Sequence, residues 1–104
     1  MQILLDFEGR PVRLLRERLE HILEHPEMLE LAGAIALTLE RPQFVVASRN
    51  DPACRLYYRR IVATLVGEKL LCVVVKVVDS GAFVLTAYLT DRVKGGTRPW
   101  PITD

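Results

Sequence analysis

The sequence has few of the residues that crosslink small proteins or bind metals. It contains 2 cysteines, Cys54 and Cys72, and no Cys-x-x-Cys spacing. Two cysteines cannot form the disulfide framework of a small secreted domain, and no spacing indicates a zinc site or a dithiol redox site. We therefore expect two reduced thiols in a cytoplasmic protein.

Long hydrophobic runs are also missing. The longest apolar stretches, such as residues 73–78, are interrupted by Lys76 and are far shorter than the roughly 18 residues that a membrane span needs. No charged-then-apolar leader opens the chain, so we expect neither secretion nor a membrane partner. No glycine-rich phosphate loop follows a strand candidate, and no Ser-His-Asp arrangement can be argued.

The composition is that of an ordinary globular protein. Of 104 residues, 50% are hydrophobic and 26% are charged, which predicts one domain over residues 1–104 with a single core. The net charge of +1 conceals an asymmetry, since residues 1–53 are net acidic and residues 54–104 are net basic. A polyanion would therefore be attracted to the C-terminal half.

Hydrophobic periodicity predicts an α+β fold: two N-terminal helices packed on a four-stranded antiparallel sheet meander, preceded by a short N-terminal hairpin. The turn Glu8-Gly9-Arg10-Pro11 indicates the hairpin within residues 1–15. Apolar spacing predicts helices over residues 15–25 and 26–40. The predicted strands, whose short connections make neighbours antiparallel, cover residues 43–49, 55–62, 69–78 and 82–90. The tail after them has Trp100 as its only large anchor.

Strand alternation predicts which side chains share a face of the sheet. On the last strand, Phe83, Leu85, Ala87 and Leu89 point one way and Val84, Thr86, Tyr88 and Thr90 the other. With the apolar faces against the helices, Lys76, Thr86 and Tyr88 meet on the open face.

The strand over residues 55–62 is ambiguous, because either register leaves a tyrosine beside an arginine. We favour the register that puts Arg55, Tyr57 and Arg59 on the open face, where rings and guanidinium groups can bind RNA. The alternative is that these side chains only cover the sheet.

The first predicted helix carries Arg18, His21 and His25 side by side, next to its apolar arc. A histidine at the edge of a cleft could transfer protons near neutral pH. Alternatively, both are ordinary surface or helix-end residues. Residues 21–25 also fit His-x-x-Glu-His, a pattern of some zinc peptidases, but we expect no metal because a third ligand and a substrate cleft are not indicated in so short a chain.

Four segments together carry a resemblance to a known superfamily. They are RLEHILEHPEM at residues 18–28, Tyr57-Tyr58-Arg59, LCVVVKV at residues 71–77 and FVLTAYLTDRVKGG at residues 83–96. With these segments the chain resembles the phage- and mobile-element-associated nuclease-fold domains of the barnase/EndoU/colicin/RelE-like superfamily. The resemblance implies cleavage of RNA without metal or other cofactor, by a toxin or effector whose partner can be a cognate antitoxin or immunity protein.

Transferred to this sequence, the resemblance implies a set of site residues. The catalytic candidates are His21, His25, Arg59, Lys76, Thr86 and Tyr88, and the substrate-binding candidates are Arg18, Arg55, Tyr57 and Lys94. In the expected reaction the ribose 2′-hydroxyl attacks the adjacent phosphorus, with a histidine as base or acid and cations stabilising the phosphate charge. The alternative is a non-catalytic RNA- or protein-binding module on the same fold.

Overall fold

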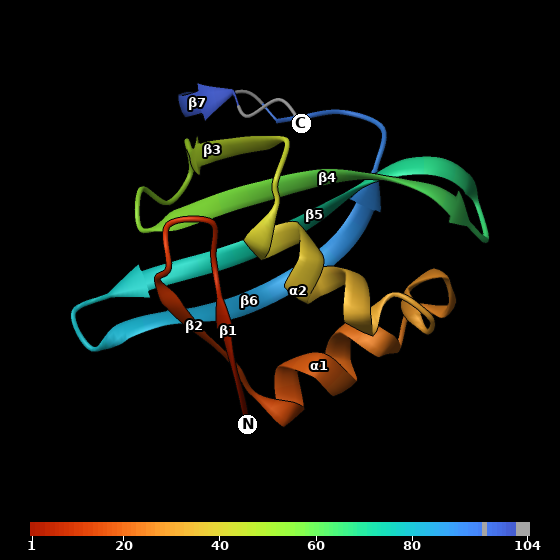
Figure 1. Cartoon of the computed structure of the whole chain (residues 1–104), viewed down its shortest axis with the longest axis horizontal. Helices are drawn as coiled ribbons and strands as arrows, with labels where there is room; N and C mark the ends of the chain where they lie inside the picture. The colour runs from red at the N-terminus through yellow and green to blue at the C-terminus, as the bar shows by residue number, and fades with distance from the viewer. Residues whose placement is uncertain (95, 102–104) are drawn as a thin grey trace.

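The computed structural model describes the backbone of residues 1–94 and 96–101 and the side chains of residues 1–94. Its centre is one mixed sheet of seven strands in the order β1-β2-β6-β5-β4-β3-β7 (Figure 1). The strands are β1 (Gln2–Leu5), β2 (Pro11–Leu14), β3 (Phe44–Ser48), β4 (Cys54–Thr64), β5 (Gly67–Val78), β6 (Gly81–Thr90) and β7 (Gly96–Pro101). The helices are α1 (Arg16–Leu23), the 3₁₀ helix η1 (Pro26–Met28) and α2 (Ala32–Glu40).

The N-terminal hairpin forms where its turn signals predict it. Gly9 takes a φ of 81° in the turn, a conformation that favours glycine. One carboxylate oxygen of Asp6 accepts hydrogen bonds from the backbone N–H groups of Glu8 and Arg10, at 3.0 and 2.8 Å. These bonds close the turn and direct β2 back along β1.

The predicted four-stranded antiparallel sheet is wrong as a description of the fold. The meander of β3, β4, β5 and β6 is present and antiparallel, but β2 adds to β6 in parallel and β7 adds to β3. Both edges of a four-stranded meander offer unpaired N–H and C=O groups that another strand can use. Turn signals report only pairings between sequence neighbours, so neither addition could be seen in the sequence.

The second predicted helix is wrong in its first half. Helix α2 begins only at Ala32, after η1 and a turn in which the Leu31 N–H donates to the Met28 carbonyl at 2.9 Å. Tighter turns between residues three apart let Met28, Leu31 and Ile35 all face the core, where each is buried. Helix α1 lies inside its predicted range.

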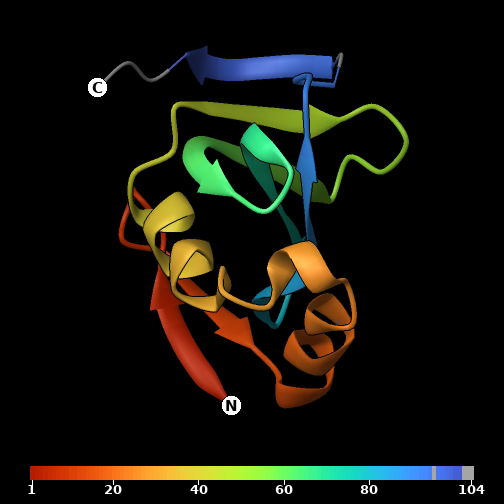
Figure 2. The same ribbon diagram turned by 90° about the vertical axis from the view of Figure 1, so that its right-hand side faces the viewer.

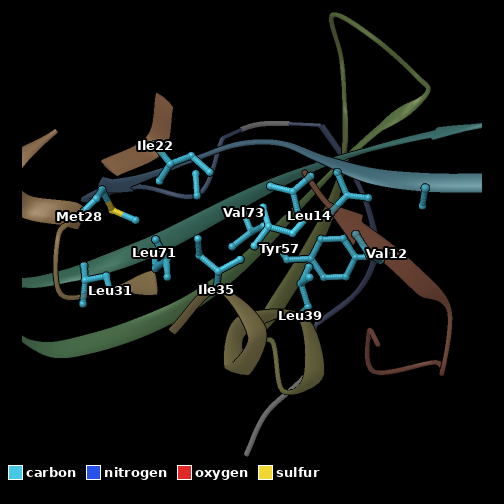
Figure 3. Close-up of a cluster of buried hydrophobic side chains, with 14 of the residues drawn as sticks. Val12, Leu14, Ile22, Met28, Leu31, Ile35, Leu39, Tyr57, Leu71 and Val73 are labelled. Atoms are coloured by element: carbon cyan, nitrogen blue, oxygen red, sulfur yellow. The ribbon is translucent and has the colours of Figure 1, made fainter. Parts of the chain in front are cut away.

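Both helices cover one face of the sheet, which we call the proximal face. Its core joins Ile22 and Met28 with Ile35 and Leu39 of α2 (Figure 3). The strands contribute the alternate residues Leu71, Val73 and Val75, together with Val12, Val45, Tyr57 and Val84. The prediction that the apolar face of β5 meets the helices is confirmed.

The register favoured for the strand over residues 55–62 is wrong. Tyr57 points to the proximal face and is fully buried, whereas Tyr58 and Leu56 point to the opposite face. The Tyr57 hydroxyl donates to the second Asp6 carboxylate oxygen at 2.8 Å. This acceptor, supplied by the hairpin, satisfies a phenol that would otherwise be buried without a partner.

A β-bulge changes the faces of β6. Val74 pairs with Thr86 and Val75 pairs with Val84, so Leu85 is an extra residue without a partner on β5. Alternation is interrupted there, and Val84 and Ala87 both face the helices. The predicted faces of Thr86, Tyr88 and Ala87 are therefore right, and those of Val84 and Leu85 are wrong.

The opposite face, which we call the distal face, carries a second buried cluster. It consists of Val46, Cys54, Leu56, Tyr58, Cys72 and Val74, with Leu85, Tyr88 and Val93 packed against it. Residues 91–94 cover part of this cluster while the chain passes from β6 to β7 at the far edge of the sheet (Figure 2). We call residues 91–94 the crossover.

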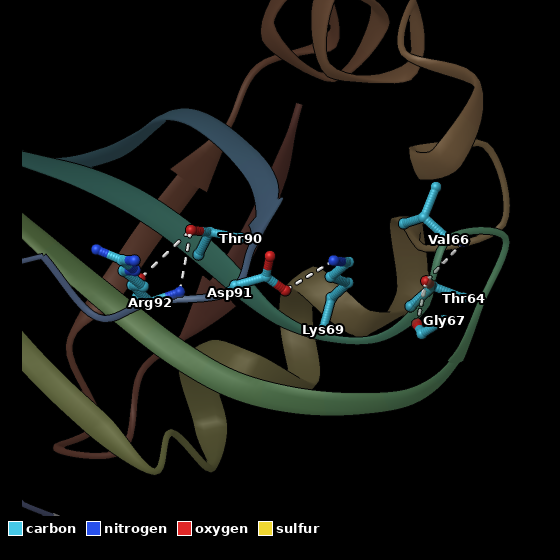
Figure 4. A network of polar contacts seen from close by, with 7 residues as sticks. All are labelled: Thr64, Val66, Gly67, Lys69, Thr90, Asp91 and Arg92. Carbon is cyan, nitrogen blue, oxygen red and sulfur yellow. Dashed lines mark hydrogen bonds and ion pairs between the residues drawn. The ribbon is translucent and has the colours of Figure 1, made fainter.

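Polar contacts hold the start of the crossover (Figure 4). Lys69 Nζ lies 2.7 Å from Asp91 Oδ1, and the Thr90 hydroxyl accepts from the Arg92 N–H at 3.3 Å. Further along, the Lys94 N–H donates to the Tyr58 hydroxyl at 3.0 Å.

The prediction that Trp100 anchors the tail concerns a side chain outside the described residues. None of the described helices is long and apolar enough to cross a membrane.

Candidate functional site

A pocket of about 450 Å³ opens on the distal face, and we call it the distal pocket. Cys54 and Leu56 of β4 and Val74 of β5 form its apolar floor. Its other lining residues, polar or charged, are Ser48, Arg49, Asn50, Thr86, Tyr88 and Lys94. The pocket thus lies between the loop after β3 and the crossover.

The crossover side of the pocket is built around Tyr88. Lys94 Nζ lies over the Tyr88 ring, 5.7 Å from its centroid, within the range of a cation–π contact. Burial raises the pKa of the Tyr88 hydroxyl, and hydrogen bonding with Cys72 raises it further. Tyr88 therefore stays protonated at neutral pH and can donate or accept a hydrogen bond, but it is a poor base.

Cys72 lies beneath the pocket, where it interacts with the hydroxyls of both Tyr58 and Tyr88. Burial raises the pKa of the Cys72 thiol to about 11 and that of Tyr58 to about 12. Because the thiolate is the reactive form of cysteine, Cys72 is unreactive at neutral pH and serves the packing of this face.

At the other end of the pocket, Asp51 holds Lys76 and Cys54. Lys76 Nζ lies 3.2 Å from Asp51 Oδ2, and the Cys54 thiol donates to the same oxygen at 3.6 Å. The backbone N–H of Ala53 and the Lys76 ammonium lower the Asp51 pKa, while burial and Asp51 raise the pKa of Cys54. Lys76 is thus neutralised by a carboxylate beside the pocket rather than free within it.

The two histidines lie on the other side of the sheet. Helix α1 packs its buried Ile22 on the proximal face, and the side chains of His21 and His25 are 63% and 62% exposed. Their Nδ1 atoms lie 3.7 Å from Glu24 and 3.9 Å from Glu27 respectively. The sheet therefore separates both histidines from Thr86 and Tyr88.

Four other predicted residues also fail to join the distal pocket. Arg55 contacts Glu8 of the hairpin at 3.4 Å, and Arg59 donates to the Arg41 carbonyl at 2.7 Å. Both share the proximal side of β4 with Tyr57, whose buried ring is out of reach of a ligand. Arg18 is exposed on α1.

Of the ten predicted site residues, the structure gathers Thr86, Tyr88 and Lys94 in one pocket. It adds Arg49, the last residue of the predicted strand over residues 43–49, and Asn50, which follows that strand. A polar turn that follows a predicted strand, with an arginine at its start, is the signal that could have pointed to them.

Metal ligands are not gathered either. In the described part of the chain no three His, Cys, Asp or Glu side chains lie together as a metal-binding group. The His-x-x-Glu-His pattern of residues 21–25 is an exposed part of α1 and the turn after it.

Comparisons of the chain with protein-family models, with curated proteins and with solved structures find no match. The resemblance to nuclease-fold domains therefore stays a prediction, and the functional argument depends on the geometry of the distal pocket.

Proposed function

We propose that the chain binds single-stranded RNA at the distal pocket, as a non-catalytic binding module. The observation that carries this proposal is the combination of an apolar floor with the exposed cations Arg49 and Lys94 at its edge. Among the described residues, neither cation has a carboxylate within ion-pairing distance of 4.0 Å. Free cations beside an aromatic ring suit a phosphate next to an unstacked base.

The size of the pocket favours a single unstacked nucleotide. Its volume of about 450 Å³ lies in the range of small-ligand sites, roughly 300–1,000 Å³. A base could lie on Leu56 and Val74 while its phosphates meet Arg49 and Lys94, and the Asn50 amide and Thr86 hydroxyl offer hydrogen bonds to a base edge. A duplex, whose bases are stacked and paired, could not enter.

RNA cleavage in the same pocket is the second candidate function. Three residues predicted for the nuclease site, Thr86, Tyr88 and Lys94, line this pocket together, and a cation with two hydroxyls can position and stabilise a phosphate. Proton transfer is the weak point, because the pKa of Tyr88 is raised and that of nearby Asp51 is lowered. Binding therefore has the stronger support.

Fluorescence anisotropy with a short labelled RNA tests the proposal. We expect an unstructured strand to bind and a duplex of the same sequence to bind more weakly. Lys94→Gln and Arg49→Gln should each weaken binding and reduce the salt dependence of log K by about 0.7 per lost phosphate contact. Arg16→Gln, which removes an exposed arginine from α1, is the matched control and should change neither.

Incubating the same RNA with EDTA present separates the two candidates. Intact RNA with binding that depends on Lys94 supports the binding module. Products with 2′,3′-cyclic phosphate ends that disappear in Tyr88→Phe would instead favour cleavage. If Arg16→Gln and Lys94→Gln weaken binding equally, the distal pocket is not the site.

A further inference from the structure

A second pocket, of about 430 Å³, lies between the N-terminal hairpin and the turn that joins β5 to β6. We call it the hairpin pocket. Its lining shares no residue with the distal pocket. The hairpin contributes Arg10 and Arg13, and the turn contributes Ser80 and Gly81.

The two arginines of this pocket lack anionic partners. Arg10 Nη1 is buried and has no hydrogen-bond partner among the described residues. Arg13 Nε donates one long bond of 3.5 Å to the Ala82 carbonyl. Neither guanidinium group lies within 4.0 Å of a carboxylate in the described part of the chain.

The nearby carboxylate of Asp6 is already committed. It is only 3% exposed and accepts hydrogen bonds from the N–H groups of Glu8 and Arg10 and from the Tyr57 hydroxyl. These bonds hold the hairpin turn against β4. Asp6 therefore does not satisfy the Arg10 side-chain nitrogen, and the pocket keeps an excess of hydrogen-bond donors and positive charge.

Arg13 and Gly81 lie side by side in the lining of this pocket. Gly81 has a φ of 129°, and a Cβ added there would lie 3.7 Å from Arg13 Nη2, so the guanidinium group lies beside bare backbone. Ser80 adds a hydroxyl that can donate to an anion. The remaining walls are apolar and include Ile3, Pro11 and Val77.

Arg10 Nη1 has almost no accessible surface, so a ligand in the pocket meets the unpaired charge of the two guanidinium groups rather than that nitrogen. Guanidinium groups bind carboxylates and phosphates through two parallel hydrogen bonds. We propose that the hairpin pocket binds a small organic oxyanion, with its charged group on Arg10 and Arg13 and an apolar body against Ile3, Pro11 and Val77. This site is separate from the proposed RNA site and does not depend on it.

Titration of the full chain followed by amide NMR shifts tests this site, with phenyl phosphate, benzoate and inorganic phosphate as probes. We expect saturable shifts at Arg13, Ser80 and Gly81. Phenyl phosphate should bind about tenfold more tightly than inorganic phosphate, because its ring buries apolar surface. Arg13→Gln should weaken binding by about tenfold or more, whereas Arg13→Lys, which keeps the charge, should weaken it less.

The three probes distinguish a site for oxyanions in general from a site that is specific for a phosphate ester. Saturation by both phenyl phosphate and benzoate supports a general oxyanion site, and saturation by phenyl phosphate alone supports a phosphate ester. Arg16→Gln, which removes an exposed arginine of α1 outside both pockets, is the matched control and should leave all three titrations unchanged. The proposal is overturned if no probe saturates, or if Arg13→Gln binds phenyl phosphate as tightly as the parent chain does.

Discussion

At the residue scale, burial and hydrogen-bond partners determine the protonation state and the role of the tyrosines. Tyr57 and Tyr58 are neighbours in sequence but point to opposite faces, and each hydroxyl has its own partner. Burial raises the pKa of both, so both act as neutral hydrogen-bonding groups. Alternation correctly predicts that they lie on opposite faces. It could not decide which faces the helices, because the acceptor for Tyr57 lies 51 residues away.

Asp51 differs from these tyrosines because it is only partly buried and its charged form contributes to stability. Its folded pKa is lowered from 3.8, first by the Ala53 N–H and then by Lys76, so its contribution is present above the unfolded pKa. The contribution is lost as the pH falls through the folded pKa. We expect Asp51→Asn to flatten the decline of urea-unfolding stability below about pH 4. Asp79→Asn, which removes an exposed carboxylate directly after β5, is the control. An equal effect of both variants would contradict the prediction.

At the element scale, a glycine near the start of α2 can be replaced to stabilise the fold. Gly33 lies in this helix, and a Cβ added there would meet nothing within 4 Å. Gly33→Ala should therefore stabilise the protein by about 0.5 kcal/mol, through lower entropy of the unfolded chain. Urea unfolding measures the change.

Gly9→Ala is the opposite case and serves as the control. Gly9 also has nothing within 4 Å of an added Cβ, but its φ is +81°. We expect a loss of about 1 kcal/mol, because an L side chain is strained in the left-handed region. A stabilised Gly9→Ala variant would show that the turn does not need this conformation.

The end of the crossover is held by a hydrogen bond that a single substitution removes. Tyr58→Phe leaves the Lys94 N–H without its acceptor, at a cost of about 1 kcal/mol. Amide exchange at Lys94 should then accelerate by roughly fivefold. Tyr57→Phe removes the bond to Asp6 instead and should leave Lys94 exchange unchanged. Unchanged exchange in Tyr58→Phe would mean that other contacts hold the crossover.

The elements themselves were largely predictable, whereas irregular features were not. Apolar spacing and turn residues locate the hairpin, α1 and the four central strands, because these signals are local. The bulge at Leu85 depends on pairing with β5, and the break before α2 depends on burying Met28 and Leu31 together. Both are decided by tertiary packing, which a single sequence does not display.

At the scale of the whole molecule, the sheet separates two sets of charged groups. The helix side carries His21 and His25 beside glutamates, while the distal pocket carries Arg49 and Lys94. This division does not follow the charge asymmetry between the halves of the chain, because Arg49 belongs to the acidic half and Arg55 of the basic half lies on the helix side. The sequence placed Thr86 and Tyr88 correctly on one face, but it could not predict that the histidines would lie behind the sheet.

The central claim is that nucleic acid binds on the distal face, away from the histidines. Mapping amide NMR shifts during titration with an unstructured RNA tests it most directly. We expect the largest saturable shifts at Arg49, Asn50, Thr86 and Lys94, and no more than small shifts across α1. Saturable shifts centred on His21 and His25, with the distal pocket unaffected, would contradict the account and return the site to the helix.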